Sequence, residues 1–368
     1  MRLTCLGAPG KGGSMKTRAH GGRRRGMDRR TFLKTAGAAV ASVGFPAIVR
    51  GAEDKRVVLY CPESPDLSSK IGKAFEAETG IAVDVQYGGT NVIVNRLLAE
   101  RSNPNADVWY GGGGLLSFLY AKREGITTPY TPPEFKDLPL REGKIYLRDK
   151  DWHFVGVEVF VIGLAYNPKN LPKKDAPKTW EDLLDPRWKG KIQMPNPAAS
   201  GTATLTVLGR MMLEKQKGRS EKDAWDYFER LNKNVSLYPE SGAAPTRAVA
   251  KGDALIGICF SFMPWGLAAR GESVDFIMPD TTPVIANPVA MVKGSKRPEN
   301  GKKLYNFILG EKGQQILADY SQIVLNKKVK SKTPMTLQEV GKYAMDMDMD
   351  WAEQNYDRIR NEWRGRFG

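Results

Sequence analysis

Strand-like and helix-like segments alternate through most of this 368-residue chain. Gly80 follows the first helical segment directly, at a place where glycine commonly ends a helix. Strands that alternate with helices at such lengths form βαβ units, so we expect an α/β fold with a parallel sheet. The first set comprises expected strands at 56–61, 81–87 and 106–109 and expected helices at 66–79 and 92–101.

A second set of alternating segments begins at residue 155. It comprises expected strands at 155–166 and 254–262 and expected helices at 203–214 and 220–232. A chain of this length exceeds the size at which one core usually stops growing, so we expect two lobes. No low-complexity linker separates the sets, which favours strands that cross between the lobes over a flexible tether. The predicted division is 53–155 with 284–335 for lobe 1, and 156–283 with the C-terminal helices at 336–368 for lobe 2.

The start of the chain is typical of an export signal. Residues 1–26 are basic and glycine-rich, and we assign them no function. In the predicted signal peptide, 27–52, Arg29 and Arg30 precede a short apolar run and a small-residue cleavage zone. A buried helix would not carry two arginines directly against its apolar stretch. The arginine pair resembles a twin-arginine signal, so we expect the twin-arginine translocase as a partner during export, and a periplasmic location.

Most of the excess positive charge lies in this leader. The whole chain has a formal charge of +15, but residues 1–52 hold 11 basic residues and one acidic residue. The remainder keeps 45 basic and 40 acidic residues, a charge of +5, and a nucleic-acid-binding protein should carry its basic patch in the folded part. We therefore predict no nucleic-acid partner. No later apolar stretch approaches the roughly 18 residues that span a bilayer, so we expect a soluble mature protein, and a monomer.

Cysteine and histidine are too few for a structural metal site. Cys61 and Cys259 remain after the leader, each inside an apolar segment, and buried free thiols are favoured over a disulfide. The two histidines, His20 and His153, are far apart in the sequence. We predict no metal and no cofactor.

Small polar residues gather where strands or loops lead into helices. In open α/β sheets, ligands bind beyond the carboxyl ends of strands, where free amides and hydroxyls at a helix start suit an anion. Ordinary capping explains any single junction equally well. The run of four glycines at 111–114 costs entropy unless backbone must approach something closely. The junction residues that we expect to bind a ligand are Thr90, Asn91, Gly112, Gly113, Ser200, Gly201, Thr202, Ser241, Gly242 and Ala243.

Five further residues complete the predicted site. Three aromatic side chains are candidate apolar walls, although each could equally be core packing. Glu63 follows the first strand, and Asn287 lies in a later apolar tract. The aromatic candidates are Tyr60, Phe262 and Trp265.

Short motifs follow one another in order along residues 55–330. They are Val57-Val58-Leu59-Tyr60, the helix end at 74–81, Ala106-Asp107-Val108-Trp109, Tyr166-Asn167-Pro168, the tract 179–192, Ser200-Gly201-Thr202-Ala203, and the tracts 289–294 and 310–314. This order resembles bacterial ABC-transporter periplasmic binding proteins of extracellular solute-binding family 1, in the branch of ferric-iron, phosphonate and sugar-phosphate binders. The resemblance implies a two-lobed type II periplasmic-binding-protein fold whose lobes are joined by crossing hinge strands. It also implies a membrane ABC permease with its ATPase as partners.

The iron-binding residues of that branch are missing here. The resemblance places a His after the first strand, a Glu after the Ala-Asp-Val strand and adjacent Tyr late in lobe 2. The corresponding segments are 61–63 (Cys-Pro-Glu), 110–112 (Tyr-Gly-Gly) and 260–265 (Phe-Ser-Phe-Met-Pro-Trp). Because ferric iron needs hard anionic donors, we expect a small organic anion instead. A phosphonate, sugar phosphate or other phosphoester is the first choice, a carboxylate the second, and ferric iron stays the alternative within this fold.

A secreted phosphoester-processing enzyme is the alternative of another class. Catalysis would need a nucleophile with a base, paired carboxylates or a metal, and the chain has no Gly-x-Ser-x-Gly motif. The alternating Met and Asp residues at 345–350 look like a solvated helix, without the glycine of a calcium loop. We therefore predict no catalytic residues and do not expect an enzyme.

Overall fold

The computed structural model describes residues 55–368, so the predicted signal peptide lies outside the described residues. The strands are β1 (Arg56–Cys61), β2 (Ala82–Tyr87), β3 (Val108–Tyr110), β4 (Thr127–Thr128), β5 (Arg141–Glu142), β6 (Ile145–Tyr146), β7 (Val155–Tyr166), β8 (Ile192–Gln193), β9 (Val235–Leu237), β10 (Ile256–Phe260), β11 (Asp275–Ile277), β12 (Val284–Val292) and β13 (Ile323–Val324). The α-helices are α1 (Pro65–Thr79), α2 (Thr90–Ala99), α3 (Leu115–Arg123), α4 (Gly201–Gln216), α5 (Glu221–Asn232), α6 (Ala244–Lys251), α7 (Phe262–Ala268), α8 (Pro298–Leu309), α9 (Glu311–Asp319), α10 (Leu337–Gly341) and α11 (Met349–Phe367). Short 3-10 helices lie at Pro133–Phe135, Lys173–Asp175, Glu181–Leu184 and Pro186–Trp188.

The first group of elements is built from βαβ units, as the sequence predicts. Strand β1 runs parallel to both β2 and β3. Helix α1 begins at Ser64, whose hydroxyl accepts a hydrogen bond from the Leu67 amide at 3.3 Å. It ends at Gly80, where a φ of 69° gives the left-handed cap that glycine favours. Residues of β1 after Arg56 are buried, because helices cover both faces of the strand.

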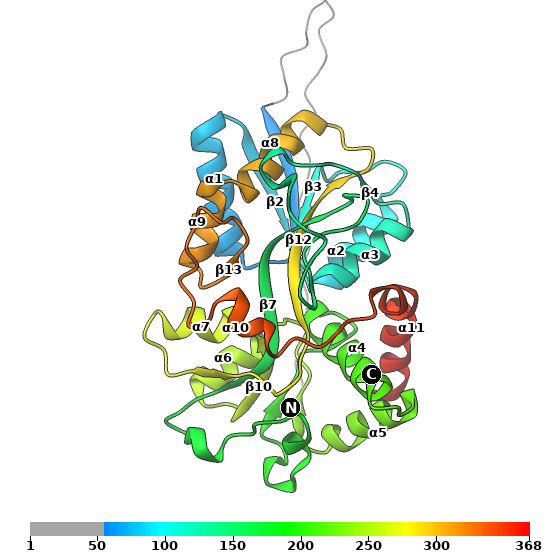
Figure 1. Cartoon of the computed structure of the whole chain (residues 1–368), viewed down its shortest axis with the longest axis vertical. Coiled ribbons are helices and arrows are strands. Elements are labelled where there is room, and N and C mark those ends of the chain that lie inside the picture. The colour runs from blue at the N-terminus through cyan, green and yellow to red at the C-terminus, as the bar shows by residue number, and fades with distance from the viewer. Residues whose placement is uncertain (1–54) are drawn as a thin grey trace, which may run out of the picture. The chain divides into compact units, whose positions relative to one another are not determined.

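Strands β7 and β12 join the first group to the second (Figure 1). They pair antiparallel, and β12 also runs antiparallel to β3, so the sheet is mixed rather than parallel as predicted. The first part of β7 pairs with β12, and its last five residues, 162–166, pair with β10. Eight strands therefore form one hydrogen-bonded path through both groups, β2-β1-β3-β12-β7-β10-β8-β9, while β5 and β6 pair separately. The expected α/β, two-lobed fold with crossing hinge strands is confirmed, whereas the residue bounds of the lobes stay a prediction.

In the second group, α4 and α6 pack against β10, and α5 packs against α4. Strand β8 lies parallel to β10 and to β9. Helix α5 begins with a reciprocal cap, in which Ser220 and Asp223 satisfy each other's backbone amides. Its buried face is apolar and mostly aromatic: Ala224, Trp225, Tyr227, Phe228 and Leu231.

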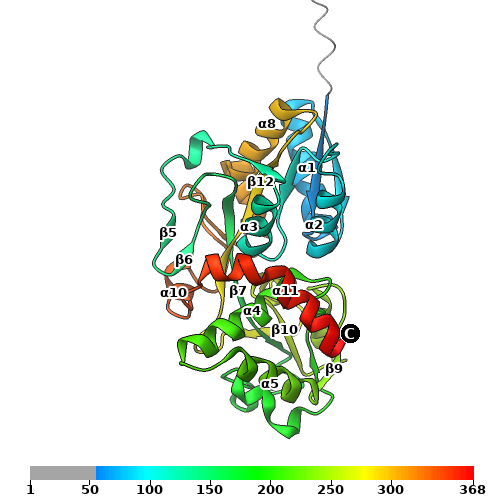
Figure 2. The ribbon, with the colours of Figure 1, turned by 90° about the vertical axis from the view of Figure 1, so that its right-hand side faces the viewer.

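The C-terminal helix α11 contacts elements of both groups and lies between α3 and α4 (Figure 2). Near its middle, the Tyr356 hydroxyl donates a hydrogen bond to Asn91 on α2 at 2.8 Å. Two residues further on, Arg358 pairs with Glu221 on α5 at 2.8 Å. Our assignment of the C-terminal helices to one lobe stays a prediction.

The segment before α11 differs from the predicted helix at 345–350. Residues 345–348 have no helical structure, and α11 begins only at Met349. Met345 and Met347 are buried while Asp346 and Asp348 face solvent, which is the two-residue alternation of an extended chain. The side chain of Asp348 caps α11 by accepting a hydrogen bond from the Trp351 amide.

Two other sequence expectations concern the described residues. Cys61 and Cys259 are both free and buried, as predicted. Within residues 55–368, no helix combines the length and apolar character needed to span a membrane.

Candidate functional site

A cavity of about 140 Å³ opens where loops of the two groups of elements meet. Engineered cavities of about 150 Å³ bind molecules the size of benzene, so this volume suits a small molecule. Ten of the predicted site residues line it: Glu63, Thr90, Gly112, Gly113, Ser200, Thr202, Ser241, Gly242, Ala243 and Phe262. The remaining wall residues are Pro62, Ser64, Pro65, Tyr87, Gly89, Glu240, Arg247, Phe260 and Met263.

The four-glycine loop between β3 and α3 forms one wall. Each of its glycines has a positive φ, between 74° and 107°, so other residues would be strained there. A β-carbon would also collide with the surroundings: at Gly111 it would lie 2.6 Å from a Glu63 oxygen, and at Gly112 2.4 Å from Pro62. The backbone of this loop therefore packs closely against neighbouring residues, as its four glycines indicate.

Hydroxyl groups line the opposite wall, at the start of α4 and the loop before α6. The backbone of Gly242 lies so close to Ser200 and Thr202 that a β-carbon on it would be 3.0 and 2.7 Å from their hydroxyl oxygens. Ser200 precedes α4 without capping it through its side chain. Within residues 55–368, neither side-chain hydroxyl donates or accepts a hydrogen bond, so both are available to a ligand.

Two charged side chains on the second group also face the cavity, and they were not among the predicted site residues. Arg247 projects from α6, and Glu240 precedes the loop that leads into that helix. Arg247 is exposed and makes no ion pair or hydrogen bond through its guanidinium with any described residue. The sequence indicated only that Arg247 lies in the helix that the Ser241-Gly242 junction opens. Helical spacing does not show which face of that helix meets the cavity.

Glu63 is buried at the base of the cavity and is held by Asn287. Its Oε1 atom accepts a hydrogen bond from Asn287 Nδ2 at 3.0 Å, and the same nitrogen donates to Glu158 Oε1 at 2.7 Å. Tyr110 donates a further hydrogen bond to that Glu158 oxygen at 2.9 Å. Burial raises the pKa of Glu63 to about 7 and raises the pKa of Glu158 well above its usual range. Asn287 thus lies behind the cavity wall and orients Glu63.

Gly201 and Asn91 lie next to the cavity without lining it. Gly201 is packed against Gly113, whose α-carbon would be 2.6 Å from a β-carbon on Gly201. Asn91 connects the two groups of elements, since its Nδ2 donates to Pro197 O at 3.0 Å.

Two of the predicted aromatic walls are core residues. The Tyr60 hydroxyl donates to Glu100 at 2.7 Å, and Arg96 lies over its ring, so this side chain points away from the cavity. Trp265 is buried edge-on against Phe276 with ring centroids 5.6 Å apart. Tyr60 and Trp265 therefore do not line the cavity, contrary to the prediction, because β1 is buried on both faces and α7 turns Trp265 inward. Phe262 does reach the wall.

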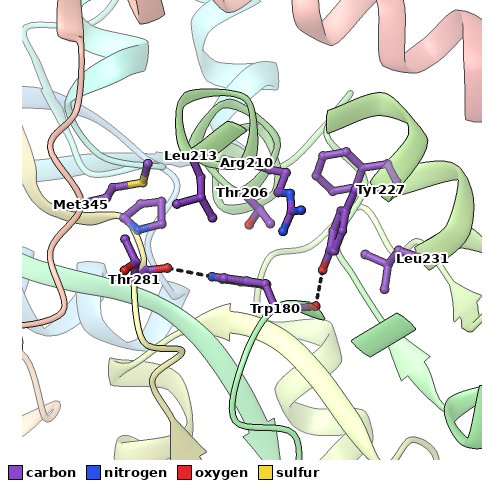
Figure 3. Close-up of a pocket in the computed structure, with 11 residues that line it drawn as sticks. Trp180, Thr206, Arg210, Leu213, Tyr227, Leu231, Thr281 and Met345 are labelled. Atoms are coloured by element: carbon purple, nitrogen blue, oxygen red, sulfur yellow. Dashed lines mark hydrogen bonds between the residues drawn. The ribbon is translucent and has the colours of Figure 1, made fainter. Parts of the chain in front are cut away.

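A second cavity lies beneath α4 and α5 and is lined mainly by apolar side chains (Figure 3). Its volume is about 10 Å³, which holds about one water molecule. Tyr227 donates a hydrogen bond to Trp180 O at 2.7 Å, and the Arg210 guanidinium lies 3.8 Å from the Tyr227 ring centroid. Arg210 also pairs with Glu181 at 2.9 Å, although its Nε atom is buried without a hydrogen-bond partner. The small volume makes this space a packing gap.

Comparison with known proteins identifies the family of this chain. The family model of bacterial extracellular solute-binding proteins matches residues 106–348. The probable ABC transporter periplasmic-binding protein y4fP of Sinorhizobium fredii is 26% identical over 335 residues, covering 87% of each chain. A putative 2-aminoethylphosphonate-binding periplasmic protein of Salmonella typhimurium is 30% identical over 261 residues, covering 67% of this chain and 70% of its own.

A solved structure extends the likeness to the whole described part. The periplasmic binding protein AfuA of Actinobacillus pleuropneumoniae, with fructose-6-phosphate bound, superposes with a TM-score of 0.76 at 27% identity. The match covers 84% of this chain and 98% of AfuA. The chain belongs to the bacterial extracellular solute-binding protein family, as the periplasmic substrate-binding component of an ABC importer.

Proposed function

We propose that this protein binds a small organic anion, either a phosphonate, a sugar phosphate or another phosphoester, in the 140 Å³ cavity. The observation that carries the proposal is the guanidinium of Arg247, which faces the cavity without a partner in the described part of the chain. Arginine forms paired, charge-assisted hydrogen bonds with phosphate oxygens. The free hydroxyls of Ser200 and Thr202 supply further donors on the same side.

The relatives support the same ligand class. One is named for 2-aminoethylphosphonate and another was solved with fructose-6-phosphate, and both ligands combine an acidic phosphorus group with a small polar skeleton. A carboxylate would meet the same guanidinium and is the second choice. Ferric iron is disfavoured because residues 55–368 contain no group of three or more His, Cys, Asp or Glu placed to hold a metal ion.

A ligand screen tests the proposal directly. The protein is mixed with ethylphosphonate, 2-aminoethylphosphonate, fructose-6-phosphate, citrate and ferric iron, and its unfolding temperature is measured. A ligand that binds the folded state alone stabilises it by about 2.7 kcal/mol at a hundredfold excess over Kd. Stabilisation by phosphorus compounds supports the proposal, whereas stabilisation by iron alone overturns it.

We also infer that the protein carries its ligand unchanged. Family members are binding proteins, and the cavity wall holds no histidine and no pair of a nucleophile with a base. Incubation with fructose-6-phosphate should release no inorganic phosphate. Release that scales with protein concentration would favour the secreted enzyme instead.

The proposal also covers the export route and the oligomeric state of the protein. The arginine pair before the apolar run at 35–48 supports transport by the twin-arginine translocase. We further propose that the mature protein is a monomer, as expected from its sequence, and sedimentation at micromolar concentration tests this.

A further inference from the structure

Two buried carboxyl groups share a single amide nitrogen at the base of the cavity. Asn287 Nδ2 lies 3.0 Å from Glu63 Oε1 and 2.7 Å from Glu158 Oε1, and the other Glu158 oxygen is buried without a hydrogen-bond partner. The carbonyl oxygen of the same side chain accepts a hydrogen bond from the Gly112 amide at 3.0 Å. Both the oxygen and the nitrogen of the Asn287 amide group are therefore hydrogen-bonded. The side chain cannot rotate towards one carboxyl group without losing its other contacts.

No positive charge among the described residues balances this pair. Neither Glu63 nor Glu158 forms an ion pair or a hydrogen bond with a Lys or Arg anywhere in residues 55–368. Their other close titratable neighbours are Cys61 on β1 and Tyr110 on β3. An unbalanced buried charge is costly, so the pair is held uncharged or must receive a cation from outside.

Only one of the two carboxyl groups can meet a ligand. Glu63 lines the cavity and is 6% exposed, whereas Glu158 on β7 is fully buried and does not line it. The other charged side chains that line the cavity are Arg247 on α6 and Glu240 before it. The cavity thus has a cation with hydroxyls in one part and a buried carboxyl group in another.

We propose that Glu63 selects ligands that carry a protonated amine beside their acidic group, and that binding such a ligand displaces the Glu63 proton into solvent. This inference rests on the proposed function, because the acidic group must be held by the Arg247 side. The ammonium group supplies the positive charge that the buried pair lacks, and it donates hydrogen bonds to the Glu63 carboxylate. Glu158 and Asn287 act as positioning residues for Glu63.

The titration of the site agrees with this geometry. Burial raises the pKa of Glu63 to about 7, so about half of the molecules carry its proton at pH 7. Burial raises the pKa values of Glu158, Cys61 and Tyr110 well above their usual ranges, whereas the raised pKa of Glu63 lies near neutral pH. Glu63 is therefore the group of this network that can exchange a proton near neutral pH.

Calorimetry with two probes of equal chain length tests the proposal. 2-Aminoethylphosphonate should bind the full-length mature protein at least tenfold more tightly than ethylphosphonate at pH 7. Binding of the amine should release about half a proton, measured as the dependence of the heat on buffer ionisation in Tris and PIPES. Ethylphosphonate should show no proton release that depends on Glu63.

A Glu63→Gln variant should reduce the preference for the amine to less than threefold and abolish proton release. Glu272→Gln, which removes an exposed carboxylate outside the cavity, is the matched control and should change neither. Proton release by the unmodified protein keeps the test decisive even if Glu63→Gln does not fold.

The outcomes separate the two proposals. Equal affinity for both phosphonates, or tighter binding of the amine without proton release, overturns the role of Glu63 and leaves the proposed function standing. Failure of both phosphonates and of fructose-6-phosphate to bind overturns both proposals.

Discussion

The backbones of Gly113 and Gly201 touch directly. A methyl group on Gly201 would lie 2.6 Å from the α-carbon of Gly113, closer than real β-carbons approach other atoms. Gly113 belongs to the loop after β3, and Gly201 is the first residue of α4. Nearby, the Asn91 amide donates to Ala199 O at 3.3 Å, so the two groups of elements meet here through backbone.

We expect Gly201→Ala to weaken ligand binding by at least about tenfold. Overpacking at a tight contact typically costs 1–3 kcal/mol, and 1.4 kcal/mol corresponds to a factor of ten. The two groups of elements would have to separate slightly, which widens the cavity between Arg247 and Glu63. Titration calorimetry with the best ligand of the screen measures the loss.

Gly365→Ala is the control for this substitution. Gly365 also lies in a helix, and a methyl group on it would meet nothing within 4 Å. Affinity should be unchanged, and stability should be equal or slightly higher because alanine favours the helix. Equal affinity for Gly201→Ala and the unmodified protein would show that the contact does not govern binding.

Removing the hydroxyls of Ser200 and Thr202 together should lower affinity by roughly a hundredfold. Each hydrogen bond to a charged group contributes about 1.5–3 kcal/mol. The fold should persist, since the Ser200 side chain does not cap α4. The double variant is Ser200→Ala with Thr202→Val, and Ser102→Ala with Thr131→Val at exposed positions serves as the control. A loss below threefold would place the acidic group elsewhere, with the loop at 111–114 as the next candidate.

Arg247→Gln should reduce affinity for phosphonates and phosphoesters by at least about tenfold, because a charge-assisted contact is lost. Its free energy of unfolding should change by less than about 0.5 kcal/mol, since Arg247 is exposed and makes no ion pair in the described region. Arg101→Gln removes an exposed arginine outside the cavity and should leave affinity unchanged. Urea denaturation and calorimetry on the same samples separate the two effects.

The stability of the unliganded protein should depend on Glu63 between pH 4.5 and 7. Burial raises the pKa of Glu63 from 4.5 to about 7, so the folded state binds one more proton than the unfolded state in this range. The stabilisation that Glu63 provides is present below pH 4.5 and is lost as pH rises to about 7. At about 1.36 kcal/mol per pKa unit, the difference in unfolding free energy between the unmodified protein and Glu63→Gln should fall by roughly 3 kcal/mol. A difference independent of pH would contradict the raised pKa.

Replacing Arg29 and Arg30 with lysine should leave the protein in the cytoplasm. The twin-arginine pathway reads the guanidinium pair, whereas the general secretory pathway requires only positive charge. Fractionation of cells that express the double variant checks this. Periplasmic protein at the unmodified level would assign export to the general pathway.

The alternation of patterns predicted several elements of both groups well. The expected strand at 56–61 is β1, the helix at 66–79 is α1 within one residue, and 155–166 is β7. These segments have strong periodicity and clear ends, such as Gly80 after α1, so local chemistry defines them. The segment 345–348 alternates between buried and exposed residues, which a helix does not produce, so the predicted helix there was based on the wrong periodicity.

The direction in which strands pair, and the face of a strand that meets the cavity, were harder to predict from the sequence. β12 pairs antiparallel with β3 and β7, a relation between residues about 130 positions or more apart that no local pattern records. Tyr60 shows the same limit, because a strand buried on both faces carries apolar residues throughout and gives no sign of which face meets the cavity.

The amino-acid sequence was sufficient to place the polar junctions at the starts of α2 and α4 and the four-glycine loop, because capping residues and glycines act locally. Their assembly into one cavity, and the burial of Glu63 beside Glu158, depend on β7 and β12 crossing between the two groups. Burial and a shared amide partner change the proton affinity of a carboxyl group, and both arise only when distant segments pack together. The sequence thus determines which functional groups the site contains, while tertiary packing determines their charge state.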